Sequence, residues 1–261
     1  MHSVLRLEFG LKAGRTVLKQ QYASGAMKVV RPFEAGEYAL LQIASVTPGI
    51  HNGDRYELSV SLQEGAKVIL LNQSATKLHG KRAGCALHDI QIQVAGGAHL
   101  EYYPGLTIPF MDAHYQQKTR IELAAGAQFG MLESWSAGRL ERGEQWEFQS
   151  LQSHIQVNLQ GKPLYRDAFH LAGHPLEGLT DQHTLWASGF WHGLPVLPAA
   201  FQDGAQLAGW GVTRSGGQYF RMLGSDTLEF QRALTAYITE RWQVTSGMQI
   251  PWKRYASGVF L

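Results

Sequence analysis

The chain has 261 residues, of which 44% are hydrophobic and 17% charged, so it can bury a substantial core and differs from a disordered chain. Its 23 lysine and arginine residues against 21 aspartate and glutamate residues give a net charge of +2, and no basic stripe is present that would neutralise phosphates, which argues against nucleic acid as a partner. The only cysteine, Cys85, excludes an intrachain disulfide.

The first residues lack the basic and then apolar layout of a secretory signal, which predicts a cytoplasmic protein. The longest apolar runs, such as residues 194–201, are short and interrupted by proline, so we expect no membrane span.

The first 45 residues contain strand-like runs at residues 5–9, 16–22 and 39–46. The segment 47–54 is dense in turn residues, and the pair Asn52-Gly53 before an alternating strand is a strong turn signal. We therefore expect early strands at one side of a β body, followed by an ordered loop that ends at Asp54.

A repeated pattern follows this loop. An alternating apolar strand, a Gly-Ala corner and a second alternating strand occur three times, with corners at Gly65, Gly97 and Gly126. The period of about 30 residues is typical of one supersecondary unit stacked on the next. The repeats extend to about Ser134, and the segments 103–105 and 108–110, which contain Pro104 and Pro109, are expected to bend the chain between the second and third units.

Further strands are predicted at residues 144–149 and 154–159, with a turn at 160–163. The segment 174–218 is rich in Gly, Pro and Trp and has no sustained period, so no structure is assigned to it. From Ser225 the pattern becomes helical: Asp226 and Glu229 have the spacing of a capping pair, and apolar side chains recur at helical spacing. This apolar stripe consists of Phe230, Leu234, Tyr237, Ile238 and Trp242.

These elements predict an all-β-dominated fold of stacked strand layers, similar to a β-solenoid or sandwich, with one or two C-terminal α-helices. We expect a single domain over residues 1–261, with a β body at about 1–220 and a helical segment at about 225–246. The helical stripe is expected to cover the β body.

The standard catalytic signatures are missing from the sequence. Its two Gly-Lys pairs, at residues 80–81 and 161–162, continue with Arg and Pro, so neither ends a phosphate-binding loop. The sequence also lacks the Gly-x-Ser-x-Gly elbow of hydrolases and the HExxH metal helix.

Eleven histidines allow a metal hypothesis. His170 and His174 are four residues apart, with His183 and His192 at nine-residue steps, but Gly173 and Pro175 argue against the helix that would align the first pair. Cys85 with His88 supplies only half of a tetrahedral site, and a lone cysteine is usually a small buried apolar residue.

Polar residues at strand ends form a second group of candidates. If those strand ends lie on one side of the stack, their side chains would line a hydrophilic surface or an interior passage and hold a divalent ion weakly. These residues also have a structural interpretation: Asp54 completes an Asx-type turn, Lys77 is solvated, and Glu144 pairs with Arg139 at the surface. The group comprises Asp54, Gln73, Ser74, Thr76, Lys77, Glu101, Glu133, Arg139 and Glu144.

The same residues carry a likeness to a known family. In their order and intervals, several segments and a terminal block followed by a helix resemble the landmarks of the urease accessory proteins called UreD, or UreH in some organisms. The segments are residues 50–54, 73–77, 100–104, 108–110, 138–144 and 221–224. The sequence departs from the family pattern in the loop 47–52, and at His79, where an aromatic residue is usual.

The resemblance implies a non-catalytic scaffold that binds apo-urease, recruits UreF and through it the GTPase UreG, and helps to deliver nickel(II). It further implies a dimeric assembly formed through UreF, no tightly bound cofactor, and a polar internal passage for nickel in transit. On the matching positions, the passage residues would be Asp54, Ser74, Thr76 and Glu133. The residues with a structural role would be Lys77, Glu101, Arg139 and Glu144.

Two alternatives stay open. One is a hydrolase or lyase that acts on a polymer from a β scaffold, with Glu133 and Glu144 as acid and base a few ångströms apart in an open groove. The other is a nickel or zinc storage protein that uses the histidines from His170 to His192, which would bind metal tightly and stoichiometrically.

Overall fold

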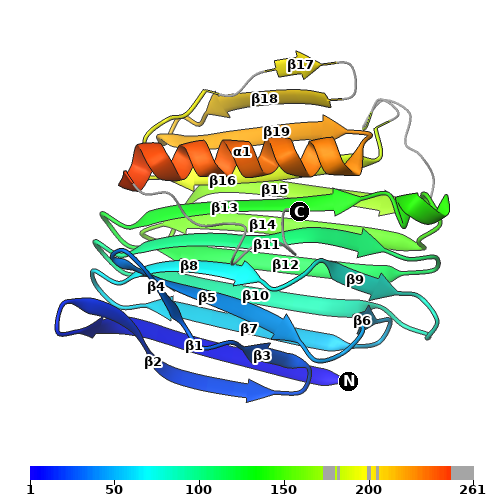
Figure 1. Cartoon of the computed structure of the whole chain (residues 1–261). Helices are drawn as coiled ribbons and strands as arrows, with labels where there is room; N and C mark the ends of the chain where they lie inside the picture. The colour runs from blue at the N-terminus through cyan, green and yellow to red at the C-terminus, as the bar shows by residue number, and fades with distance from the viewer. Residues whose placement is uncertain (173–179, 181–182, 199–200, 204–205, 248–261) are drawn as a thin grey trace.

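The computed structural model describes residues 1–172, 180, 183–198, 201–203 and 206–247. Two sheets face each other, and one long helix lies on the outer face of the second sheet (Figure 1). No helix in the described part of the chain is long and apolar enough to cross a membrane.

Sheet A has seven strands and carries the N-terminus. In spatial order they are β15 (Lys162–Ala172), β14 (Ser150–Leu159), β12 (His114–Leu123), β10 (Ala86–Val94), β7 (Arg55–Leu62), β1 (His2–Lys12) and β2 (Arg15–Ser24).

Sheet B has twelve strands. The continuous order is β17 (Phe201–Asp203), β18 (Gln206–Val212), β19 (Gly217–Gly224), β16 (Leu185–His192), β13 (Gln128–Ser136), β11 (His99–Pro109), β8 (Lys67–Asn72), β5 (Tyr38–Ser45) and β3 (Met27–Val29). Off this path lie β4 (Phe33–Ala35), β6 (Ile50–His51) and β9 (Thr76–His79).

The repeated sequence pattern builds stacked coils, as predicted. Each coil runs along a strand of sheet A, turns a corner and returns along a strand of sheet B, in the pairs β7–β8, β10–β11 and β12–β13. The corner glycines Gly65, Gly97 and Gly126 all have positive φ, which glycine adopts without steric cost. The N–H of Gly65 donates to the carbonyl of Gly96 and that of Gly97 to the carbonyl of Gly126, so successive corners are hydrogen-bonded to one another.

The alternation within each strand explains which face is buried. In β7 the side chains of Leu58, Val60 and Leu62 are buried between the sheets, while the intervening Glu57, Ser59 and Ser61 are only half-buried. Burial of each such apolar side chain contributes roughly 2 kcal/mol before the entropic cost of ordering it. The main core therefore lies between the sheets.

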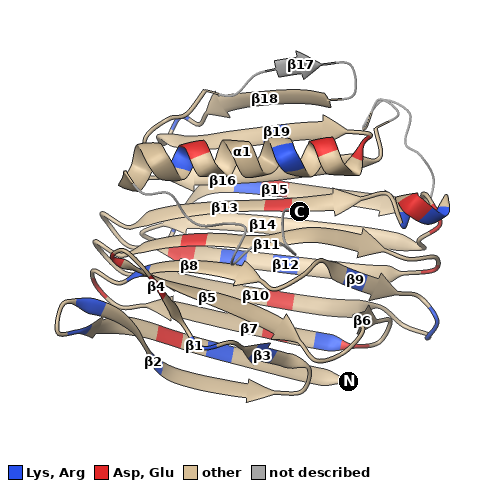
Figure 2. Ribbon diagram, viewed as in Figure 1, with Lys and Arg blue, Asp and Glu red and all other residues tan. Residues whose placement is uncertain are grey.

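Helix α1 (Thr227–Ser246) covers the outer face of sheet B through its predicted apolar stripe, whose members Phe230, Leu234 and Trp242 are among the buried residues. The Asp226 side chain accepts a hydrogen bond from the N–H of Glu229, as the capping pair predicts. Gly247 ends the helix with positive φ. Acidic and basic residues both occur along the helix (Figure 2), and one of the basic residues, Arg241, is buried.

The segment 144–149 was wrongly predicted as a strand. It is a loop that follows a short 3-10 helix, η1 (Leu140–Arg142), and Trp146 within it has positive φ. The Trp146 indole stacks on Trp186 at 6.0 Å between ring centroids and is nearly parallel to it. The apolar alternation here reflects side chains that a loop buries, and the next strand, β14, begins only at Ser150.

Two further segments differ from expectation or fill a gap. The strand β11 continues through Pro104 and absorbs the irregularity as a shift of register between Tyr102 and Gly105, whereas it ends at Pro109, where the chain was expected to bend. The unassigned segment 174–218 contributes strands β16, β17 and β18 and the first residues of β19.

Candidate functional site

One inner-face position of sheet A is polar in five neighbouring strands. Ser3, Tyr56, His88, Gln117 and Ser153 pair in register across β1, β7, β10, β12 and β14, in a line perpendicular to the strands. We call these five residues the polar row. Their neighbours on the same face are mainly apolar, so the polar row crosses an otherwise apolar core along the axis of the coil stack.

Hydrogen bonds connect the polar row to a carboxylate of sheet B. His88 Nδ1 lies 2.8 Å from the Tyr115 hydroxyl, which donates to Gln117 Oε1 at 3.1 Å. Gln117 Nε2 in turn donates to Glu133 Oε2 at 2.8 Å. Three hydrogen bonds thus lead from a histidine of β10 to Glu133 of β13.

Glu133 is a buried acid, with 3% of its surface exposed. Its Oε1 accepts hydrogen bonds from the Trp135 indole at 3.1 Å and from the Ser153 hydroxyl at 3.3 Å. Burial is the main cause that raises the pKa of Glu133 to about 7, and the charge of Asp167 adds to the effect, while the hydrogen bonds oppose it. This carboxyl therefore changes its charge near neutral pH.

A cavity of about 200 Å³ adjoins one end of this hydrogen-bonded chain. Tyr56 and His88 line it from sheet A, and Ser74 and Thr76 line it from the β8–β9 connection and β9. Burial lowers the pKa of His88 to about 4, so its imidazole is neutral at physiological pH. Two of the predicted passage residues, Ser74 and Thr76, thus lie at the same cavity as His88.

The other end of the hydrogen-bonded chain lies near β15, an edge strand of sheet A, and near β16 and β19 of sheet B. Glu133 pairs in register with Ser188 of β16, and Ser188 with Arg221 of β19. The Ser188 hydroxyl donates to Asp167 Oδ2 at 2.7 Å, and Arg221 Nη2 lies 2.7 Å from Asp167 Oδ1. Because the Arg221 side chain is 44% exposed, this ion pair connects the interior polar residues to solvent.

Asp54, the fourth predicted passage residue, is fixed within a turn next to the polar row. Its carboxylate accepts hydrogen bonds from the N–H of His51 at 2.9 Å and from the backbone nitrogen of Met1 at 2.7 Å. Burial alone would raise the pKa of the Asp54 carboxyl, but these hydrogen bonds outweigh it and leave the pKa below its ordinary value. Asp54 is not among the residues that line the 200 Å³ cavity.

His79 packs against other rings in the loop before Asp54. Its ring stacks on His51 at 4.6 Å between centroids and meets Phe110 edge-on at 4.5 Å. The loop before Asp54 is therefore held by ring contacts.

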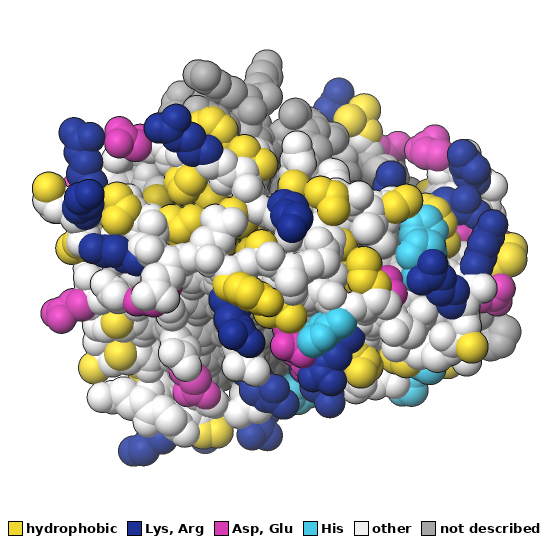
Figure 3. Space-filling model, turned by 90° about the horizontal axis from the view of Figure 1, so that it is seen from below, with side chains coloured by type: hydrophobic (Ala, Val, Ile, Leu, Met, Phe, Trp, Pro, Cys, Tyr) yellow, Lys and Arg dark blue, Asp and Glu magenta, His cyan; other side chains and the backbone are white. Residues whose placement is uncertain are grey.

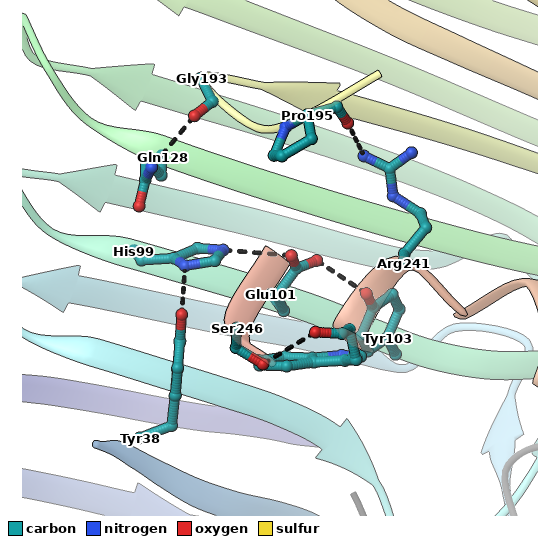
Figure 4. A network of polar contacts seen from close by, with 10 residues as sticks. Tyr38, His99, Glu101, Tyr103, Gln128, Gly193, Pro195, Arg241 and Ser246 are labelled. Atoms are coloured by element: carbon teal, nitrogen blue, oxygen red, sulfur yellow. Dashed lines mark hydrogen bonds and ion pairs between the residues drawn. The ribbon is translucent and has the colours of Figure 1, made fainter. Parts of the chain in front are cut away.

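Glu101 lies on the opposite face of sheet B from Glu133, beneath helix α1 (Figure 4). His99 Nε2 lies 3.1 Å from Glu101 Oε1, and the Tyr103 hydroxyl donates to Glu101 Oε2 at 2.7 Å. Tyr38 joins this cluster through His99 Nδ1 at 2.8 Å. Glu101 is thus separated from the polar row by the sheet itself.

The other residues predicted to be structural have simple surroundings. Arg139 Nε donates to Glu144 Oε2 at 2.9 Å, and Glu144 Oε1 accepts from the N–H of Met111 at 2.8 Å. The pair ties the loop after β13 to the end of β11, although Glu144 is buried and does not lie at the surface as the structural interpretation assumed. Lys77 is exposed, on the rim of the cavity.

The metal candidates of the histidine-rich segment are dispersed. His170 lies 3.0 Å from the Ser150 hydroxyl and His183 lies 2.9 Å from that of Ser225, while His174 is outside the described residues. In the part of the chain that the structure describes, no three His, Cys, Asp or Glu side chains gather as metal ligands. On the face seen from below, histidines lie among lysine and arginine side chains (Figure 3).

A polymer-active enzyme would need Glu133 and Glu144 side by side in an open groove, and the structure does not place them so. Glu133 is enclosed between the sheets, whereas Glu144 is paired with Arg139 in the loop after β13.

Two members of the hydrogen-bonded chain, Tyr115 and Gln117, were missed by the sequence reasoning, and His88 was considered only as a partner of Cys85 in a metal site. A signal for the polar row was nevertheless present, because Tyr56, His88 and Gln117 each stand nine residues before the corner glycine of their coil. Aligning the three repeats on their corner glycines would have shown one polar column among apolar ones.

Comparison with known proteins matches the chain to one protein family. A family model described as "UreD urease accessory protein" matches residues 1–254. The chain is 37% identical to "Urease accessory protein UreD 1" of Synechococcus sp. (strain JA-3-3Ab) over 246 residues, covering 92% of this chain and 91% of that protein. It is 30% identical over 258 residues to UreD of Nostoc sp. (strain PCC 7120), covering 94% and 91%. It is also 32% identical over 167 residues to UreH of Helicobacter pylori (strain P12), covering 63% of each.

Proposed function

Since the chain belongs to the UreD family of urease accessory proteins, we propose that it is a non-catalytic scaffold that delivers nickel(II) to apo-urease. In this role it works in the cytoplasm, in a complex with UreF and, through UreF, with UreG, and the complex is dimeric through UreF. Nickel is its cargo and not a resident cofactor.

The observation that supports this proposal most strongly is the hydrogen-bonded chain from His88 to Glu133 through the apolar core. A divalent ion cannot cross an apolar interior without polar atoms that replace its water. The polar row with Tyr115 and Glu133 supplies hydroxyl, imidazole, amide and carboxylate groups in succession. We propose that nickel travels along this line between the cavity at Ser74 and Thr76 and the Asp167–Arg221 pair.

The chemistry of the donors fits transit. Sites built from several thiolates or imidazoles hold nickel tightly, whereas single, spaced oxygen and nitrogen donors exchange it readily. Glu133 is the only carboxylate in the hydrogen-bonded chain described above, and it can accept a cation when it is ionised. In this proposal Asp54 supports the loop beside the route and does not line it.

The test is deletion of the gene in a urease-positive host. Urease protein is expected to accumulate without nickel and without activity, and the wild-type gene supplied in trans should restore both. Fully metallated urease in the deletion strain would refute the proposal.

Two substitutions separate transport from assembly. Glu133→Ala removes the interior carboxylate and should slow activation of urease while co-purification with urease and the other accessory proteins persists. Asp54→Ala should also slow activation, by loosening the adjoining loop. Loss of the complex in Glu133→Ala would show that Glu133 holds the fold and carries no nickel. Turnover of a polymer by the isolated chain, or tight stoichiometric nickel binding through its histidines, would favour the enzyme or storage alternatives.

A further inference from the structure

The 200 Å³ cavity has an apolar floor and a polar rim. Its floor consists of buried side chains of the main core, whereas Ser45, Ser74 and Lys77 line it from exposed positions. An apolar wall with a few polar groups at one side is typical of sites for small molecules. The buried apolar residues of the floor are Met27, Ile43, Ile50, Leu58 and Tyr102.

The rim carries one positive charge that the fold does not neutralise. Lys77 has an exposed side chain on β9, and no aspartate or glutamate is among the described residues that line the cavity. Within the described part of the chain, the Lys77 amine has neither an ion-pair partner nor a hydrogen-bond partner. The carboxylate of Asp54, two residues from the lining residue Tyr56, is already bound to the N-terminal nitrogen and to the N–H of His51. The rim is therefore positive.

Hydroxyl groups add hydrogen-bond donors beside this charge. Thr76 Oγ1 accepts from the Asn72 amide at 3.5 Å, which leaves the Thr76 proton free to donate. The Ser74 hydroxyl has no hydrogen-bond partner among the described residues. A lysine amine only donates and an ionised carboxylate only accepts, and hydrogen bonds between such charged groups are the stronger ones. The ligand group that complements this rim is therefore a carboxylate.

The volume of the cavity limits the rest of the ligand. A dry apolar cavity of about 150 Å³ takes up benzene. The 200 Å³ found here accommodates a ring of that size with a carboxylate at the rim. Drug-sized ligands need about 300 Å³ or more, and a ligand as small as acetate would leave the apolar floor uncovered.

We propose that this cavity binds a small monocarboxylate with a compact apolar body, of the size of benzoate. The body lies on the apolar floor, and the carboxylate accepts hydrogen bonds from Lys77, Ser74 and Thr76. The inference goes beyond the proposed function and does not depend on it, because binding is measured on the purified chain without nickel or urease.

The first test is calorimetric titration of the purified full chain with sodium benzoate and with benzamide, which has the same ring but no charge. The wild-type chain is expected to bind benzoate at one site, at least about fivefold more tightly than benzamide, and Lys77→Gln should abolish this preference. Lys118→Gln is the matched control, because Lys118 is exposed on β12 away from the cavity, and it should bind benzoate as the wild-type chain does. Equal binding of benzoate and benzamide by the wild-type chain, or unchanged benzoate binding by Lys77→Gln, would overturn the proposal.

A second test locates the ligand and needs no substitution. In NMR spectra of the methyl-labelled wild-type chain, benzoate should give nuclear Overhauser effects to the methyl groups of Ile43 and Ile50. It should give none to Ile155, which is buried in the same core but does not line the cavity. Contacts confined to methyl groups elsewhere, or no saturable shift of the Ile43 and Ile50 resonances up to about 20 mM benzoate, would show that the cavity is not a carboxylate site.

Discussion

Replacing Glu133 by glutamine should remove a pH dependence from the stability of the folded chain. In the folded protein the pKa of Glu133 is about 7, against an ordinary value of 4.5, because burial disfavours the charged form. The folded state therefore holds this proton more tightly than the unfolded state does. The associated stability is fully present below pH 4.5 and is lost progressively as the pH rises to about 7.

The size of the effect follows from the two pKa values. Each pKa unit corresponds to 1.36 kcal/mol, so the free energy of unfolding should fall by about 3 kcal/mol between pH 4.5 and pH 8 on account of Glu133. Glu133→Gln keeps the acceptor for Trp135 and Ser153 but has no proton to lose. Its new amide must donate to Gln117, which can turn its own amide to accept.

Urea denaturation followed by tryptophan fluorescence at pH 5, 6, 7 and 8 would measure how the free energy of unfolding depends on pH. Relative to the wild-type chain, Glu133→Gln should gain about 2–3 kcal/mol between pH 5 and pH 8, regardless of its absolute stability at either pH. Glu122→Gln, at an exposed position of β12, controls for the loss of one negative charge. A constant difference between wild type and Glu133→Gln across this range would refute the reasoning about burial.

Three further predictions concern the scaffold. Asp226→Ala removes the side-chain cap of α1 and should lower the free energy of unfolding by about 1 kcal/mol, whereas Asp226→Asn should retain most of it. Gly130→Ala places a Cβ 2.0 Å from Glu101 Oε2, which must therefore move. We expect the free energy of unfolding, measured by chemical denaturation, to fall by about 1–3 kcal/mol. An unchanged denaturation midpoint would mean that this contact relaxes freely. Glu144→Ala leaves Arg139 and a backbone N–H unpaired, and we expect a loss of about 1–3 kcal/mol together with faster proteolysis of the loop 139–149; resistance equal to wild type would contradict this role.

The parts of the fold that the sequence predicted are those where local chemistry and tertiary structure agree. The corners at Gly65, Gly97 and Gly126 and the capped helix after Asp226 have signals that need only a few neighbouring residues. The prediction failed at residues 144–149, where the bulk of Trp146 is buried by stacking on Trp186 and not by a strand.

The segment 174–218 could not be assigned because some of its glycines are required by side-chain packing. A Cβ at Gly189 would lie 2.4 Å from the Trp191 indole, so glycine here makes room for a ring and does not mark a turn. The spacing of apolar residues along the sequence does not reveal such a packing requirement, and strand β16 was therefore missed.

The candidate site could be predicted only in part, for a similar reason. Ser74 and Thr76 do lie at one cavity, and Glu133 is connected to the same cavity through Gln117, Tyr115 and His88. Glu101 was first grouped with them as a polar residue at a strand end, but alternation along β11 places it on the opposite face, beneath α1. Which strand ends share a face depends on the register between coils, and the sequence alone does not give that register.

The in-register stacking of the coils has a consequence for how such a molecule can change length. Each of β7, β10, β12 and β14 adds one side chain to the polar row, and neighbouring strands are about 4.8 Å apart. Duplicating or deleting one whole coil would alter the span of the interior line by that increment and keep its width. An insertion of a single residue within one strand would instead turn that strand's polar side chain outward and open a gap of about 10 Å. The length of the polar row is therefore set, in steps of one strand spacing, by the number of coils.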